Sequence, residues 1–121
     1  MDYFIAALIV LVLLQVKHWY VDFVNQTEEE VKYKGVYLDW RGVKHSLKHG
    51  ISTFLILFLA SDFSTAFGLA SFDFLLHYHT DWIKMKYGNR DITTPAFWNH
   101  LGLDQMVHQI GYIIIIFLLV I

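Results

Sequence analysis

The sequence predicts an all-α integral membrane protein, a four-helix bundle with both termini on the non-cytoplasmic side. Three observations support this fold class: high hydropathy, four long apolar stretches and the sorting of positive charges along the chain. Of the 121 residues, 56% are hydrophobic and 17% are charged, and the mean hydropathy is +0.45. A soluble domain of this size would have to expose much of that apolar surface. We therefore expect residues 1–121 to form a single multi-pass domain in the inner (plasma) membrane.

The first helix is expected over residues 3–24, where an apolar run continues into a mixed segment. Its length of roughly 33 Å is enough to cross a bilayer. A signal peptide would place positive charge before the apolar core and a small-residue cleavage site after it. Here the first positive charge, Lys17, follows the core and no such site is present, so we expect a retained helix.

Three further helices are expected over residues 45–60, 65–86 and 97–121. The second is short for a membrane span and would have to lie nearly perpendicular to the bilayer or thin it slightly. A polar turn around residues 61–65 joins the second and third helices, and Asp62 is expected to serve there as a turn residue or helix cap. Residues 25–44 are polar, and residues 87–96 contain the single proline, so both segments are interpreted as loops.

The positive charges predict the orientation of the bundle. All nine Lys and Arg lie in the 25–44 and 87–96 loops or at the helix ends near them, and none lies toward the termini or the 61–65 turn. The positive-inside rule therefore places both loops in the cytoplasm and both termini outside. The four tryptophans lie toward the same side, as interfacial anchors do.

Each predicted helix carries polar residues four positions apart, a spacing that keeps them near one helix face. In an alternating bundle all these clusters meet at the cytoplasmic end, and buried ionisable groups in membranes tend to face one another. The clusters are His18, Asp22 and Gln26; His45 and His49; Asp73, His77 and Asp81 with Lys84; and His100, Asp104 and His108 with Gln105.

Histidine and carboxylate are the ligands that zinc, manganese and iron use, so the clusters predict a divalent metal site, with zinc expected first. Eight candidate ligands would suffice for two metals. The candidate ligands are His18, Asp22, His45, His49, His77, Asp81, Asp104 and His108. Gln26, Asp73, His100 and Gln105 are expected to support the ligands or orient substrate. Asp22 or Asp104 would act as general base and Lys84 would hold a phosphate or a lipid headgroup.

The alternative to a metal site is a buried hydrogen-bond network that fixes helix pairing. His79 lies two residues off the face of His77 and is expected to be an interfacial residue. Lys48, Lys86 and the run Glu28–Glu30 are expected to be solvated charges. Asp73 lies deepest in its helix and is expected either to bond a histidine or to be protonated.

The motifs His18-x3-Asp22-x3-Gln26, His45-x3-His49, His77-x3-Asp81-x2-Lys84 and Asp104-Gln105-x2-His108 resemble a family of small polytopic membrane proteins of bacteria and phages, a domain of unknown function. The resemblance covers nearly the whole chain. The pattern is more distantly similar to an inner-membrane family described as metal-dependent hydrolases, and that similarity implies a metal and hydrolysis. The additional histidines at 79 and 100 and the long first loop depart from the pattern.

Two classes of function stay open from the sequence. The first is a metal-dependent hydrolase acting on a phosphate-containing or lipid-linked substrate. The second is a non-enzymatic membrane protein: an ion or metal carrier, or a phage accessory protein that binds a host membrane partner. The net charge of −2 argues against nucleic acid as a partner, and the absence of cysteine excludes thiol chemistry. Membrane lipids are expected contacts, and a homo-oligomer is an open alternative.

Overall fold

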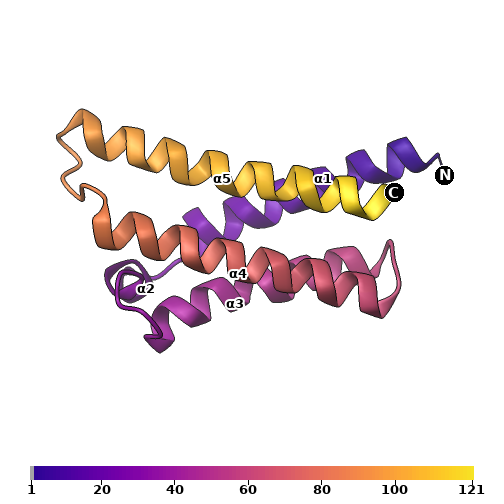
Figure 1. Ribbon diagram of the computed structural model, residues 1–121, viewed down its shortest axis with the longest axis horizontal. Helices are drawn as coiled ribbons and strands as arrows, with labels where there is room; N and C mark the ends of the chain where they lie inside the picture. The colour runs from indigo at the N-terminus through magenta and orange to yellow at the C-terminus, as the bar shows by residue number, and fades with distance from the viewer. Residues whose placement is uncertain (1) are drawn as a thin grey trace.

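The computed structural model describes residues 2–121, which form helices and no strand (Figure 1). Four long helices run antiparallel along a common axis, and a short helix lies across one end of the bundle. The elements are α1 (Tyr3–Trp19), continued by the π-helical turn η1 (Tyr20–Val24), then α2 (Glu28–Tyr33), α3 (Trp40–Phe58), α4 (Phe63–Tyr87) and α5 (Pro95–Val120).

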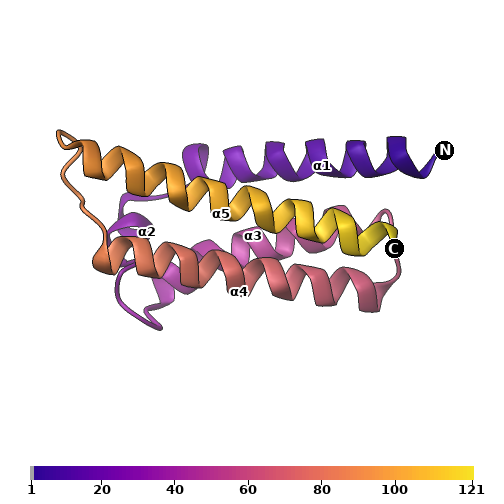
Figure 2. The ribbon, with the colours of Figure 1, turned by 45° about the horizontal axis from the view of Figure 1, so that its top comes forward.

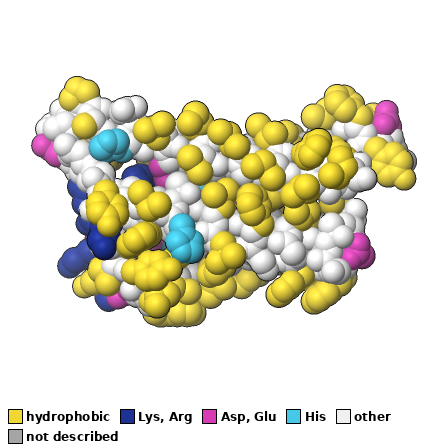
Figure 3. Space-filling model, in the orientation of Figure 1, with side chains coloured by type: hydrophobic (Ala, Val, Ile, Leu, Met, Phe, Trp, Pro, Cys, Tyr) yellow, Lys and Arg dark blue, Asp and Glu magenta, His cyan; other side chains and the backbone are white. Residues whose placement is uncertain are grey.

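The two ends of the bundle differ in content. Both chain ends and the α3–α4 turn lie at one end, whereas α2 and the α4–α5 loop lie at the other (Figures 1 and 2). In the face drawn in Figure 3, Lys and Arg side chains gather at the α2 end and hydrophobic side chains cover the length of the bundle. The alternating topology expected from the sequence is therefore present in the structure.

Helices α3 and α5 begin earlier than predicted, at positions where the sequence has residues that favour a helix start. Helix α3 begins at residue 40, five residues before the expected start, because the Asp39 side chain accepts from the backbone N–H of Arg41. Helix α5 begins at Pro95, a residue whose fixed φ suits the first helical position. Asp62 caps α4 by accepting from the N–H of Thr65, as expected. The expected 25–44 loop therefore holds α2 and the first turn of α3.

The interior of the bundle is polar at the α2 end and apolar at the other. A small hydrophobic core occupies the end near the termini; its buried members are Val10, Leu14, Leu57, Ala66, Tyr112 and Ile115. Toward α2 most of the buried side chains are instead polar, chiefly His, Asp and Lys. A soluble protein shows the reverse distribution, because burying charge costs free energy and burying apolar area releases it.

Two helices, Tyr3–Val24 and Pro95–Val120, are long and apolar enough to cross a membrane. Only 33% and 28% of their most apolar stretches are buried in the bundle, so most of this apolar surface faces outward. Helices α3 and α4 carry more polar side chains, among them Lys48 and Asp73, and are not in that class.

Close helix packing at the polar end depends on a glycine. A Cβ on Gly50 in α3 would lie 3.1 Å from the Cβ of Phe74 in α4. Small residues at such crossings let two backbones approach, which is typical of helix pairs in membranes. Gly50 directly follows His49, so this close approach brings His49 toward His77, and their ring centroids lie 3.5 Å apart.

Candidate metal centre

All eight predicted ligands are buried together in the α2 half of the bundle. Each of the four long helices contributes a pair: His18 and Asp22 from α1 and η1, His45 and His49 from α3, His77 and Asp81 from α4, and Asp104 and His108 from α5. None of these residues exposes more than 7% of its surface. The four-residue spacings therefore do converge on one site, as the sequence predicts.

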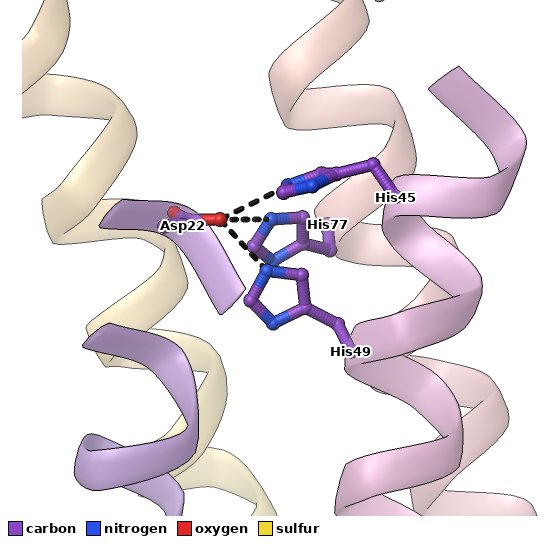
Figure 4. Close-up of side chains that lie close together, drawn as sticks. All are labelled: Asp22, His45, His49 and His77. Carbon is purple, nitrogen blue, oxygen red and sulfur yellow. Dashed lines mark hydrogen bonds and ion pairs between the residues drawn. The ribbon is translucent and has the colours of Figure 1, made fainter. Parts of the chain in front are cut away.

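The centre of this site is the carboxylate of Asp22, which three imidazoles face (Figure 4). Its Oδ1 lies 3.0 Å from Nε2 of His45, 2.7 Å from Nε2 of His49 and 3.4 Å from Nε2 of His77. Ligand atoms around a tetrahedral zinc at about 2.0–2.1 Å lie roughly 3.3 Å from one another. Two of the three contacts are hydrogen bonds shorter than that value, so these four side chains could hold a cation after small shifts apart.

His77 carries the clearest sign of a missing partner. Both of its ring nitrogens are buried, and neither has a hydrogen-bond partner among the described residues. A buried polar nitrogen left without a partner costs free energy, and such atoms are rare. A cation beside Nε2 would supply that partner.

A second group of possible ligands adjoins the first. His77, Asp81 and His108 also offer ligand atoms within 4.8 Å of one another. Nε2 of His108 lies 3.2 Å from Oδ1 of Asp81, and Nε2 of His77 lies 3.4 Å from Oδ2 of Asp81. Because His77 belongs to both groups, the two positions are adjacent and not independent.

Two of the predicted ligands lie beside these groups and not within them. The hydrogen-bond partners of His18 are neutral groups, with Nδ1 2.9 Å from the hydroxyl of Tyr112 and Nε2 2.7 Å from Oε1 of Gln105. Its Nε2 also lies 3.4 Å from Oδ2 of Asp22. Asp104 accepts from Lys84 at 2.8 Å and from Gln105 at 3.1 Å. Both residues surround the ligand groups, whereas Asp22, His45, His49, His77, Asp81 and His108 make them up.

Each of the buried aspartates other than Asp22 forms an ion pair with one lysine. Nζ of Lys17 lies 2.9 Å from Asp73, Nζ of Lys34 lies 2.9 Å from Asp81 and Nζ of Lys84 lies 2.8 Å from Asp104. Buried carboxylates are stable only when they are paired in this way.

Glu30 is also paired with a lysine, at 2.6 Å from Nζ of Lys48. Among the buried carboxylates of residues 2–121, Asp22 is thus the one without a lysine partner; it faces imidazoles instead. The position that calls for an additional cation is therefore the one beside Asp22.

Glu30 itself contradicts the expectation that the run Glu28–Glu30 is solvated. Glu28 and Glu29 are exposed, but Glu30 is 1% exposed because a capping box with Thr27 turns it inward at the start of α2. Oε2 of Glu30 lies 3.3 Å from Nδ1 of His45. Burial disfavours the ionised form, yet the ammonium of Lys48 and the ring of His45 hold the pKa of Glu30 below its usual value.

The contact between Glu30 and His45 has the form of a carboxylate that orients a ligating imidazole through its other nitrogen. Lys48, expected to be solvated, is half-buried against Glu30.

Asp73 also differs from expectation. It pairs with Lys17 and accepts from the hydroxyl of Thr53 at 2.6 Å, so its partner is a lysine and not a histidine. The reason is that Lys17, expected near a helix end, points into the bundle and is only 8% exposed.

The predicted supporting residues divide into two sets. Gln105 contacts His18 and Asp104, and Gln26 donates to the backbone carbonyl of Asp22, so both adjoin the centre. His100 lies apart from it and accepts from the N–H of Asn89. His79 bonds the hydroxyl of Tyr37 and the carbonyl of Leu75, away from the centre.

Four residues that contact the cluster were not predicted from the sequence: Lys17, Glu30, Lys34 and Tyr112. Thr27-x-x-Glu30 is a capping-box pattern that could have predicted α2. Lys17 also has a signal, because a lysine within a helix expected to cross the membrane tends to face the bundle interior. Lys34 and Tyr112 have none, because their partners depend on how the helices and the loop pack.

Comparison with known proteins identifies the family of this chain. Residues 10–121 match the family described as "Protein of unknown function (DUF3307)", so the chain belongs to that family. No curated protein matches the chain, and no solved structure does.

Proposed function

We propose that this member of the DUF3307 family is a multi-pass inner-membrane protein that binds a divalent cation and hydrolyses a phosphate-containing or lipid-linked substrate. The observation that carries the proposal is the group Asp22, His45, His49 and His77, whose ligand atoms lie within 4.8 Å of one another in a buried site. One carboxylate and three imidazoles are a common donor set for zinc, with manganese and iron as alternatives.

The membrane location is supported by the inverted distribution of polarity. Apolar side chains cover the outside of α1 and α5, and charged ones lie inside the bundle. Helices α3 and α4 expose Ile51, Leu55, Phe67 and Leu75 to the surroundings, so their outer faces are apolar as well. We propose that all four long helices cross the membrane, with the lysine-rich α2 end in the cytoplasm.

The pairing of lysines with aspartates favours one cation over two. Asp81 and Asp104 already have Lys34 and Lys84 as counter-charges, and only Asp22 lacks one. A second divalent ion beside Asp81 would have to displace the ammonium of Lys34. We therefore expect one tightly held cation beside Asp22, with His108 and Asp81 bordering it.

A divalent cation in such a site acts as a Lewis acid and activates water at neutral pH. The residues around it would then have separate roles. Asp104 lies outside both ligand groups, next to His108, and is the better candidate for general base, whereas Asp22 is occupied as a ligand. Lys84 donates to Asp104, and its partly exposed side chain could also bind a phosphate oxygen.

The second candidate function is ion or proton transport, favoured by the chain Lys17, Asp73 and Thr53, which extends the polar network deeper than the metal centre. Beyond these residues lies the apolar core around Leu14, Leu57 and Ile115. A carrier needs a path to both faces of the membrane, so this core favours hydrolysis over transport.

The test is metal content and activity of the protein purified in detergent. We expect one bound cation per chain by elemental analysis and hydrolysis of a phosphoester or phospholipid panel that a chelator abolishes and added metal restores. Ion flux in liposomes without hydrolysis would favour the carrier. Protein that binds no divalent cation at micromolar concentration would overturn the proposal.

A further inference from the structure

A basic pocket opens at the α2 end of the bundle, beside the metal centre. Its volume is about 410 Å³, and four cationic side chains, Lys32, Lys34, Lys84 and Arg90, line it together with Gln26 and no carboxylate. Arg90 is held there by two hydrogen bonds from its guanidinium to the carbonyl of Met85. Such a pocket is complementary to an anion.

The pocket touches the metal centre through two of these lysines. Lys34 bonds Asp81, which belongs to the second ligand group, and Lys84 bonds Asp104, which contacts His108. An anion bound among the lysines would therefore be separated from the ligand groups only by the side chains of Lys34 and Lys84.

An apolar groove joins this pocket from the side of the bundle. It runs between α4 and α5, has a volume of about 460 Å³ and shares Lys84 and His100 with the basic pocket. Ile83 and Leu103 line its walls and are about half exposed. In Figure 3 basic and acidic atoms are visible in a recess of the otherwise hydrophobic surface near this end.

The charges of the site also call for an anion. The pairs of Lys17, Lys34 and Lys84 with their aspartates are neutral, so a divalent cation on Asp22 leaves one positive charge without a protein partner. A net charge in a site of low dielectric constant is costly, and a phosphate would offset it. This step rests on the proposed function.

We infer that the pocket and groove together bind an anionic phospholipid that enters from the bilayer between α4 and α5. The phosphate lies among Lys34, Lys84 and Arg90, and an acyl chain lies along Ile83 and Leu103. A lipid is favoured over a soluble phosphoester because the groove is apolar and opens on the surface that we assign to the membrane. The substrate class of the metal centre is then a membrane phospholipid or a lipid-linked phosphate.

The experiment measures lipid retained by the whole protein in nanodiscs of phosphatidylcholine with a minor share of phosphatidylglycerol, by native mass spectrometry. Lys32→Gln with Arg90→Gln should lower retained phosphatidylglycerol about tenfold, because each basic residue adds to the electrostatic attraction of an anionic lipid. The matched control, Lys44→Gln with Lys86→Gln, removes two lysines outside the pocket and should leave retention unchanged. An equal loss in both would show general surface attraction and overturn the inference.

A second pair of variants tests the groove. Leu103→Trp fills it and should lower retention, whereas Met106→Trp, equally exposed on the same helix but outside the groove, should not. If inorganic phosphate displaces the bound anion and Leu103→Trp has no effect, the ligand is a soluble anion and the lipid inference is wrong.

Metal content measured on the same samples separates this inference from the proposed function. Retention that is specific to the pocket but occurs without metal would support the lipid site and overturn the metal centre. Bound metal without retained phosphatidylglycerol would overturn the lipid site alone.

Discussion

Nε2 of His49 lies 2.7 Å from Oδ1 of Asp22, the shortest of three imidazole contacts that meet on this oxygen. Asp22 lies in η1 and His49 lies in α3, and α2 and its flanking loops separate the two in the sequence. Their contact therefore depends on how the helices pack. A carboxylate with imidazole neighbours and no lysine can be neutralised by a protonated histidine or by a metal ion. Metal affinity measured after the charge of Asp22 is removed distinguishes the two cases.

Asp22→Asn should therefore remove the metal. The variant loses a ligand and the one buried negative charge that lacks a lysine, so we expect metal affinity to fall by more than the about 10- to 100-fold that loss of a supporting contact costs. The measurement is metal titration of the detergent-purified protein. Asp91→Asn, in the exposed α4–α5 loop, is the control; unchanged affinity in Asp22→Asn would rule out the assignment.

His77→Ala and His79→Ala form a matched pair on the same helix. His77 belongs to both ligand groups, whereas His79 bonds Tyr37 near the surface. Metal at 100 times its Kd should stabilise the wild type by about 2.7 kcal/mol, and this gain should vanish in His77→Ala and persist in His79→Ala. Thermal unfolding followed by tryptophan fluorescence, with and without metal, measures the gain. Similar responses of the two variants would contradict the placement of the site.

Asp104→Asn should separate chemistry from metal binding. Asp104 lies outside both ligand groups, and its partner Lys84 is partly exposed and can be solvated. We expect the variant to keep its metal and to lose about 10²- to 10⁴-fold in kcat, the range for a general base. A parallel loss of metal and rate would make Asp104 a ligand instead.

The sequence predicted the convergence of these side chains because helical periodicity is a local property. The spacings His45-x3-His49 and His77-x3-Asp81 place each pair near one helix face, and alternation of four helices places all pairs at one end. Hydropathy likewise predicted the four long helices, with errors at both starts and ends, but not the short helix α2.

The pairing of individual side chains could not be predicted in the same way. Whether Lys17 reaches Asp73, or Lys34 reaches Asp81, depends on helix rotation and on the path of the chain around α2. Glu30 shows this most clearly. Its neighbours Glu28 and Glu29 are exposed, and only the capping box with Thr27 turns Glu30 toward His45.

Glu30→Gln should destabilise the protein in a pH-dependent manner. The folded state lowers the pKa of Glu30, so the ionised carboxylate stabilises the fold above its unfolded-state pKa of about 4.5 and loses this effect as pH falls through the lowered value. We expect a cost of about 1–3 kcal/mol at pH 7 that shrinks progressively below pH 4.5. The free energies of unfolding of wild type and variant, compared across pH, give this difference; a cost independent of pH would show that charge is not the cause.

The pair Lys17 and Asp73 is expected to be replaceable as a unit. Lys17→Met alone leaves the buried carboxylate of Asp73 with Thr53 as its remaining partner and should cost about 3–5 kcal/mol. Lys17→Met with Asp73→Leu removes both charges and should recover most of that loss. Unfolding of the two single variants and the double variant in mixed detergent micelles completes the cycle.

The same double variant tests the role of this pair in the site. Nζ of Lys17 also lies 3.0 Å from Nδ1 of His49, and an ammonium only donates, so this contact requires a bare Nδ1 and a proton on Nε2. A metal ligand at Nε2 needs the opposite tautomer, with the proton on Nδ1. Metal binding must therefore break the Lys17–His49 contact, and the double variant should bind metal at least as tightly as the wild type. If it instead loses metal while it stays folded, Lys17 and Asp73 support the ligand set, and the expectation that the Lys17–His49 contact opposes metal binding is wrong.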